Sequence, residues 1–514
     1  NDTNNLNDAV STDGQRYSFT YDDKGNVLTS KIEADKPAQP IEVGKHYVIR
    51  NAESGNVLDN GQSVGKVHNW RYRKGNTNQI WLVESTGENG VYNVNFNDAT
   101  QVKDVRDQGA YQGGCPTEGD VRVLVIPVEF SDRTAASLGY DIDKLETAFN
   151  GDNKDTTYYS VSNYFKESSY GKLNLTFDIY DGWFRPEYAS SYYANYYDDI
   201  NGEEVWLGDQ VVMDEALEYL SQSMDLSIYD SDNNSMIDAV VLISTNEING
   251  EHDFTWAARY WNFYIDDNGY KFKYDDVSAN DYVWCPYQFM FEKEEGKYDG
   301  YDIINPLTFI HEFSHILGAD DYYNYNGHVS PLENHDIMDN MTSDHNPYTK
   351  INYGWIKNSK LIVTDSSVTL NLNSFIETGE TIIIANNWDA TLGAYQEYYI
   401  LMYYKNESLN LVDNVGLFKD EGILMYHVNA SLIFDEAYGY NVYNNNTTIY
   451  GGDYDGTEDN LIEFVKFTSY QIIYTEGCTS SADIIDDQGN KISYTFTVDS
   501  LTDEYATITF NKNN

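Results

Sequence analysis

The stretch from His311 to Asp321 reads HEFSHILGADD and contains the pattern HExxHxxGxxD. Residues four apart share one face of a helix, so His311 and His315 can direct their imidazoles at a single metal ion. Glu312 stands beside them, where a carboxylate can take a proton from a water that the metal activates. The pattern therefore predicts a zinc peptidase site.

The third ligand follows from the turn after the helix. Gly318 can adopt the left-handed conformation that ends a helix, and the reversal would bring Asp321 back to the ion. Two alternatives stay open. Asp320 is adjacent and also acidic, and Glu333 stands about twenty residues downstream, as in another zinc architecture. The residues around Glu333 are typical of a loop, which favours Asp321.

The residues around the motif favour a buried helix. Asn305 is suited to the N-cap and Pro306 to the first helical position. The helix would present the apolar side chains of Leu307, Phe309, Ile310, Phe313, Ile316 and Leu317.

Further segments resemble those of the immune inhibitor A-like secreted metallopeptidases. They are Asp120–Asp132, Ser162–Phe165, Ser168–Leu173, Asp336–Met338, Tyr353–Trp355 and Gly422–Val428. The resemblance implies a metzincin-like, zinc-dependent endopeptidase that hydrolyses peptide bonds in proteins. Its zinc ligands would be His311, His315 and Asp321, and Glu312 would be the general base that acts on a zinc-activated water.

The resemblance also implies a methionine turn. Met338 would lie beneath the zinc as an apolar floor and would not be a ligand. Astacin-type metzincins carry a tyrosine two residues later, where Asn340 stands here. The residue that stabilises the oxyanion is therefore not identified, and Tyr348 is one candidate.

The composition is strongly acidic, with 32 Lys and Arg against 83 Asp and Glu and a net charge of −51. Such a surface repels phosphate backbones and anionic membranes, which excludes nucleic acid as an expected partner. No apolar run approaches the length of a membrane span. We expect a secreted protein, free or associated with the cell surface, and the three cysteines do not indicate a disulfide framework.

The chain divides into four expected parts: a polar segment 1–40, a β-rich module 41–114, the zinc peptidase domain 117–358 and a β-sandwich 359–514. Residues 44–84 resemble one repeat of a ricin-type β-trefoil lectin and include Gln79-Ile80-Trp81. The module could bind glycans or act as a pro-region that shields the active site. Cys115, just after it, could hold the zinc in a latent state or be a linker residue without function.

The order of elements predicts an α+β fold. Val121–Phe130 and Ala239–Ser244 have the apolar runs of buried strands, and Asp209–Ser223 has helical periodicity. After Trp355 the chain predicts short strands at Thr381–Ala385, Tyr398–Tyr404, Gly422–Val428, Gln471–Tyr474, Lys491–Val498 and Tyr505–Phe510.

A second metal site is expected in the loop that precedes Ala239. Asp230, Asp232, Asn234 and Asp238 occupy positions 1, 3, 5 and 9 of an EF-hand-like pattern, which would hold Ca²⁺. Ser235 replaces the usual glycine at position 6, so an acidic turn without a metal is the alternative.

The expected function is zinc-dependent proteolysis, with protein or peptide substrates, Zn²⁺ as cofactor and Ca²⁺ as a candidate second ion. The rival function is that of a secreted protein that binds glycans or proteins and keeps a non-catalytic zinc site. The intact Glu312 favours catalysis, because a non-catalytic site has no need of a base.

Overall fold

The computed structural model describes residues 114–513 and, before them, the backbone of eight short strands. Gaps in the described part are 154, 201, 250–252, 267–268, 271, 275, 292–302, 324–329, 341–342, 390–391, 412–417, 436–439 and 444–459. The fold is a mixture of helices and several sheets, which confirms the α+β class.

The first large sheet has five strands in the order β10-β9-β14-β19-β15. Their bounds are Leu173–Ile179, Gly119–Val128, Val240–Ser244, Tyr282–Pro286 and Ala258–Tyr260. The first four strands are mutually parallel, and β15 runs antiparallel along β19 at the edge. A parallel sheet needs cover on both faces, which explains the apolar runs of β9 and β14.

Helices cover both faces of this sheet. On one face lie α2 (Ile142–Asn150), α3 (Val161–Ser168) and α6 (Leu307–Ile316), in a core with Val123, Val241 and Cys285. On the other face α5 (Gly208–Ser221) packs in a second core with Leu124, Val240 and Trp284. Because neighbouring strand residues point to opposite faces, β9 and β14 supply both cores.

The C-terminal region consists of two facing sheets. One has the order β27-β24-β23-β22-β20-β8 and the other β21-β29-β28. The bounds of the first are Ile462–Phe464, Gly422–Asn429, Glu397–Tyr404, Ile382–Ile384, Asn358–Ile362 and Val91–Asn95, and those of the second are Val368–Asn373, Tyr505–Lys512 and Tyr494–Leu501. A third core fills the space between them, with Leu401, Met425 and Phe496 among its buried members.

Strand β8 comes from the N-terminal part of the chain. Val91–Asn95 pairs antiparallel with β20, and Val91 is buried in the core of the two facing sheets. These residues belong to the expected module 41–114, so that module contributes a strand to the C-terminal sheet.

Smaller elements complete the chain. The helices are α1 (Ala135–Leu138), α4 (Ser190–Ala194), α7 (Ile337–Asn340), α8 (Pro347–Asn352) and α9 (Phe375–Thr378), with 3-10 turns at Leu226–Tyr229, Asp253–Thr255, Tyr287–Met290 and Ser408–Asn410. The short strand pairs are β11 (Tyr197–Ile200) with β12 (Glu203–Trp206), β13 (Met236–Ile237) with β18 (Ser278–Ala279), β16 (Ile265–Asp266) with β17 (Gly269–Tyr270), and β25 (Leu432–Asp435) with β26 (Tyr440–Tyr443). Before residue 91 the strands are β1 (Asp8–Val10), β2 (Arg16–Tyr21), β3 (Val27–Glu33), β4 (His46–Tyr47), β5 (Val57–Gly61), β6 (Lys66–Trp70) and β7 (Trp81–Leu82).

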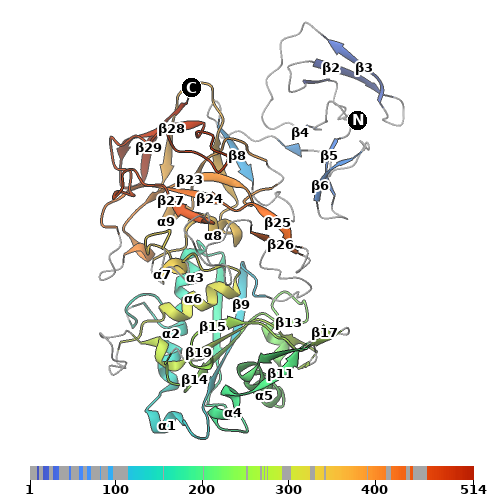
Figure 1. Ribbon diagram of the computed structural model, residues 1–514, viewed down its shortest axis with the longest axis vertical. Helices are drawn as coiled ribbons and strands as arrows, with labels where there is room; N and C mark the ends of the chain where they lie inside the picture. Colours follow the sequence, from blue (N-terminus) through green and yellow to red (C-terminus); the bar gives the residue numbers. More distant parts are fainter. Residues whose placement is uncertain are drawn as a thin grey trace.

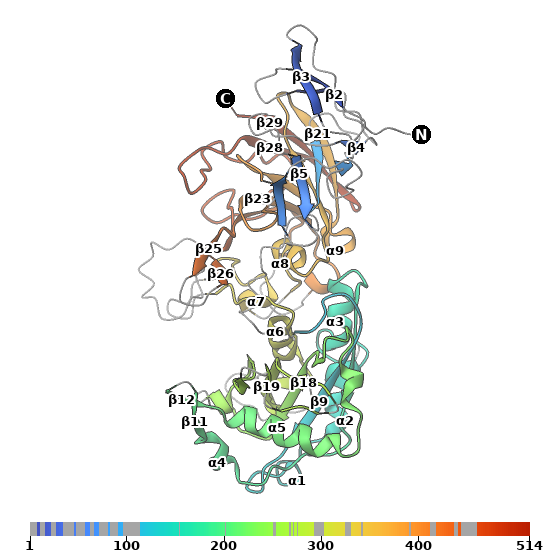
Figure 2. The same ribbon diagram turned by 90° about the vertical axis from the view of Figure 1, so that its right-hand side faces the viewer.

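Helix α6 lies between the five-stranded sheet and the C-terminal sheets in both views (Figures 1 and 2). The core that contains α6 extends into the C-terminal region. Ile400, Leu424 and Phe464 of that region belong to the same buried cluster. The expected boundary at residue 358 therefore crosses a continuous core, and the division into domains stays a prediction.

Most expected elements are found. Strands β9, β14, β22, β23, β24, β28 and β29 and helix α5 lie where the sequence predicts them, with ends shifted by a few residues. The prediction of a strand at Gln471–Tyr474 is wrong. Only isolated β-bridges occur there, between Thr468 and Gln471 and between Ile423 and Tyr474. Among the described residues no helix is both long and apolar enough to cross a bilayer.

Candidate metal centre

The two histidines of α6 are oriented by backbone carbonyls. Nδ1 of His311 lies 2.8 Å from the oxygen of Ile337, and Nδ1 of His315 lies 2.7 Å from the oxygen of Ala319. A carbonyl oxygen can only accept, so both Nδ1 atoms carry the proton. When a ring is neutral, it therefore presents the lone pair of Nε2, which is the arrangement of a metal-ligating histidine.

These lone pairs converge with a carboxylate. Oδ1 of Asp321 lies 3.0 Å from Nε2 of His311 and 3.4 Å from Nε2 of His315. A carboxylate oxygen this close to two Nε2 atoms is stabilised either by a proton on one of them or by a metal ion in the same place. Burial lowers the pKa of His315, but the Asp321 carboxylate outweighs this and raises it to about 9. Two imidazole nitrogens and one carboxylate oxygen are a donor set that suits Zn²⁺.

The turn after α6 brings the aspartate into place. Gly318 has a φ of 103°, which residues with a side chain rarely adopt. The N–H of Gly318 bonds the carbonyl of His315, and the N–H of Ala319 bonds that of Ser314. The predicted left-handed reversal is confirmed, and the same turn carries the Ala319 carbonyl that orients His315.

Glu312 is buried beside the three converging groups, with 7% of its surface exposed. Burial raises the pKa of its carboxyl, while the two imidazoles act in the opposite direction. The backbone N–H of Arg259, in the edge strand β15, donates to this carboxylate. The contact fixes a carboxylate that could accept a proton.

Sequence reasoning missed two partners of the site, Tyr323 and the backbone of Arg259. The Tyr323 hydroxyl donates to Asp321, and its ring stacks near that of His311 with centroids 6.4 Å apart. Burial, together with the carboxylates of Asp321 and Glu312, raises the Tyr323 pKa. Tyr323 could have been found from the sequence, because it follows Asp321 by only two residues. Nothing in the sequence indicates that Arg259 contacts Glu312.

Hydrogen bonds fix the segment Asp336–Met338, which contacts His311. Met338 is fully buried on α7, and its N–H bonds Oδ1 of Asp336 at 2.7 Å. Oδ2 of Asp336 accepts from the N–H of Asn346 at 2.7 Å. The carbonyl of Ile337, between Asp336 and Met338, is the one that receives the His311 proton. The segment Asp336–Met338 thus orients His311.

The other candidates lie apart from this group. Glu333 is half-buried and pairs with Lys466, and Asp320 is not among the converging side chains. Tyr348, the candidate for the oxyanion, is buried in the core. Three more histidines, His328, His335 and His345, follow the motif in the sequence. His335 stacks on Phe418, and His345 is a core residue between aromatic rings. His328 lies outside the described residues.

The helix begins one residue later than predicted. Pro306 is the N-cap and Leu307 the first residue of α6. Asn305 still supports the helix start, because its Oδ1 accepts the N–H of Leu307 at 3.3 Å.

Residues 37–117 match the family described as ricin-type beta-trefoil lectin domain-like. The expected likeness of 44–84 to a ricin-type repeat is thereby confirmed. The match covers a minor part of the chain and ends before the described helices. No curated protein matches the sequence.

Cys115 is buried, and burial raises the pKa of its thiol, with the charges of Asp238, Asp281 and Asp232 adding to the effect. All three cysteines are free. A thiol held protonated among carboxylates is a poor metal ligand, which favours the linker alternative for Cys115.

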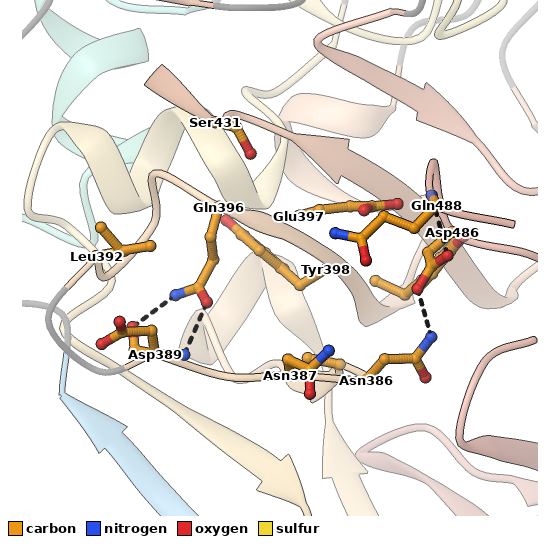
Figure 3. Close-up of a pocket in the computed structure, with 12 residues that line it drawn as sticks. Asn386, Asn387, Asp389, Leu392, Gln396, Glu397, Tyr398, Ser431, Asp486 and Gln488 are labelled. Atoms are coloured by element: carbon orange, nitrogen blue, oxygen red, sulfur yellow. Dashed lines mark hydrogen bonds between the residues drawn. The ribbon is translucent and has the colours of Figure 1, made fainter. Parts of the chain in front are cut away.

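Two further groups of ligand-type side chains lie within the described residues. One consists of Asp230, Asp232 and Asp238, from the expected calcium loop. The other, Glu397, His427 and Asp487, is next to a pocket of about 270 Å³ on the C-terminal sheets (Figure 3).

The polar groups of that pocket largely bind one another. Gln396 accepts from the N–H of Asp389 and donates to its carbonyl, both at 2.9 Å, and Asn386 donates to Asp486 at 2.7 Å. His427 lies 2.9 Å from Glu397 and 3.6 Å from Glu463. An ion pair of a protonated histidine therefore accounts for the group without a metal.

Proposed function

We propose that the chain is a secreted, zinc-dependent endopeptidase related to the immune inhibitor A-like metallopeptidases, with a metzincin-like catalytic domain at residues 117–358. The observation that carries the proposal is the convergence of Nε2 of His311, Nε2 of His315 and Oδ1 of Asp321, within 4.8 Å of one another, beside a buried Glu312. The acidic composition and the resemblance of the surrounding segments support it.

In this proposal the zinc ion and Glu312 have separate roles in the hydrolysis. A zinc ion at such a site lowers the pKa of a water molecule toward neutrality and polarises the scissile carbonyl. Glu312 accepts the proton of the attacking water on its carboxylate and delivers it to the leaving amine nitrogen. The Arg259 N–H holds the Glu312 carboxylate in place.

The test compares Glu312→Gln with Glu333→Gln in the full chain, on a denatured protein substrate and with zinc analysis of each sample. We expect Glu312→Gln to keep zinc and lose about 10²–10⁴-fold in activity. Glu333→Gln removes an acid of the surface pair with Lys466 and should remain active. Wild-type activity in Glu312→Gln contradicts the proposal, as does a zinc-loaded wild type that cleaves nothing.

A second candidate function is glycan binding by the N-terminal module, favoured by the ricin-type match at 37–117. The two functions are compatible in one chain. A glycan array probed with the full chain and with Trp81→Ala tests it, because Trp81 belongs to the Gln-x-Trp signature. Equal binding by both proteins, or binding by neither, contradicts this candidate.

A further inference from the structure

The loop between Tyr229 and β14, which includes the two residues of β13, gathers three carboxylates of different burial. One oxygen each of Asp230, Asp232 and Asp238 lies within 4.8 Å of the others. Asp238 is 1% exposed, Asp230 is half-buried and Asp232 faces solvent. The group therefore extends from the protein interior to the surface, which gives an ion a path of entry.

Backbone N–H groups of the same loop fix these carboxylates. Oδ2 of Asp238 accepts from Ser231 at 2.9 Å. The two oxygens of Asp230 accept from Asn234 and Ser235, each at 2.9 Å. Oδ1 of Asp232 accepts from Asn234 at 3.1 Å. The side chains are thus held facing one another although their charges repel.

No lysine or arginine in the described part of the chain offsets this repulsion by an ion pair. Arg122 in β9 and Arg259 in β15, strands of the nearby sheet, pair with Asp178 and Asp281. Within the described residues Oδ1 of Asp238 is buried and accepts no hydrogen bond. A buried carboxylate oxygen without a donor, next to two more carboxylates, is costly unless a cation compensates it.

We propose that this loop binds one Ca²⁺ ion through Asp230, Asp232 and Asp238. The ligand atoms are all oxygens, which a hard cation prefers and which are unlike the imidazole-rich group on α6. The missing glycine is no obstacle, because Ser235 itself adopts a φ of 69° at position 6. Asn234, at position 5, contacts the group through Nδ2, 3.1 Å from Oδ2 of Asp232.

A bound ion would tie together several elements that meet at this loop. The N–H of Asp238 bonds the carbonyl of Tyr229 at 2.8 Å, and the N–H of Ser278 in β18 bonds that of Ser235 at 3.1 Å. The central strand β14 starts two residues after Asp238. Calcium should therefore raise the temperature at which the five-stranded sheet unfolds.

The test measures calcium binding by titration calorimetry and the unfolding midpoint, with and without Ca²⁺, on the full chain. Asp232→Asn changes an exposed ligand and should fold normally, while Asp238→Asn changes the buried one. Glu218→Gln, on the exposed side of α5, is the control for loss of one charge. We expect the wild type and the control to bind with a Kd on the order of 10⁻³ M or tighter.

Both Asp variants should bind Ca²⁺ at least roughly tenfold more weakly and lose the calcium-dependent rise in midpoint, since each removes a charged ligand. Because Asp232→Asn leaves the core intact, its result decides the matter if Asp238→Asn fails to fold. The proposal is overturned if the wild type takes up no Ca²⁺ or if Asp232→Asn binds as tightly as the wild type.

Discussion

At the scale of single residues, the candidate metal centre depends on which nitrogen of each imidazole carries the proton. The carbonyls of Ile337 and Ala319 accept a hydrogen bond from Nδ1, so His311 and His315 need only lose the Nε2 proton, with no change of conformation, to present Nε2 to a metal. Such outer hydrogen bonds typically contribute 10–100-fold to metal affinity. These two hydrogen bonds thus fix the orientation of both rings.

Asp321→Asn should lower zinc affinity by more than the roughly 10–100-fold typical of an outer-sphere change, because it removes a converging charged oxygen. Zinc content after dialysis against a weak chelator measures the effect. Asp320→Asn is the matched control, one residue away and outside the converging group. Equal zinc loss in both variants would mean that general charge, and not a ligand, holds the ion.

Only part of this site could be predicted. His311, Glu312 and His315 share one helical turn and Asp321 follows a glycine, so local geometry is sufficient to group them. The N–H of Arg259 reaches Glu312 because β15 lies at the sheet edge beside α6, a tertiary arrangement without a local signal.

At the scale of elements, the end of α6 has two functions. Its turn returns Asp321 to the histidines, and it presents the carbonyl that orients His315. A change of backbone conformation at Gly318 therefore affects a ligand on each side of the turn.

Gly318→Ala should cost about 1–3 kcal/mol of stability, because alanine is strained at a φ of 103°. It should also lower zinc occupancy. Gly489→Ala is the control, since Gly489 has a φ of 80° in the distant C-terminal region. Chemical denaturation and metal analysis separate the two effects, and normal zinc binding by Gly318→Ala would contradict the link between turn and site.

Helix α8 carries a buried ion pair. Nζ of Lys350 lies 2.5 Å from Oδ2 of Asp344, and neither side chain is more than 4% exposed. Lys350 also donates to the Tyr170 hydroxyl, which in turn donates to the carbonyl of Phe375 in α9. The pair thus joins α8 to α9, the first helix after residue 358.

Lys350→Met should cost about 3–5 kcal/mol, because Asp344 would remain buried without its cation. Lys357→Met removes an exposed pair with Glu118, and such pairs contribute only about 0–1 kcal/mol. Urea denaturation of both variants provides the comparison. A loss at position 350 no larger than at position 357 would show that Asp344 becomes protonated or hydrated without cost.

At the scale of the whole molecule, one buried core connects the sheet that supports α6 with the C-terminal sheets. The sequence predicts the strands on both sides, because short runs of apolar, β-branched and aromatic residues are a local signal. It predicts a boundary near residue 358 for the same reason, since the change of pattern is local and the shared core is not. Cooperative unfolding of both regions is the expected consequence.

His427 gives this cooperative unit a defined pH dependence. Burial lowers its pKa, but hydrogen bonds to Glu397 and Glu463 outweigh this and raise it to about 9, above the value of about 6.5 in an unfolded chain. The stabilisation is therefore complete below pH about 6.5 and is lost as the pH rises through about 9. The pKa of Glu463 is lowered, so protonation of Glu463 at acidic pH removes the stabilisation that its charged carboxylate contributes.

The unfolding midpoint of His427→Gln should consequently fall below that of the wild type between pH about 5 and 6.5, with the two curves converging above pH about 9. Differential scanning calorimetry across this range measures the gap. A gap that is constant with pH would mean that packing against Tyr399, and not charge, is what the substitution removes.

The pairing of strand β8 sets an order in which the six-stranded sheet can form during synthesis of the chain. Val91 pairs with Ile362 and Asn95 with Asn358, so the outer edge of the six-stranded sheet joins parts of the chain that the ribosome makes far apart in time. Such non-local pairings are slow to form. The strand Val91–Asn95 therefore stays unpaired until the chain as far as Ile362 has emerged from the ribosome.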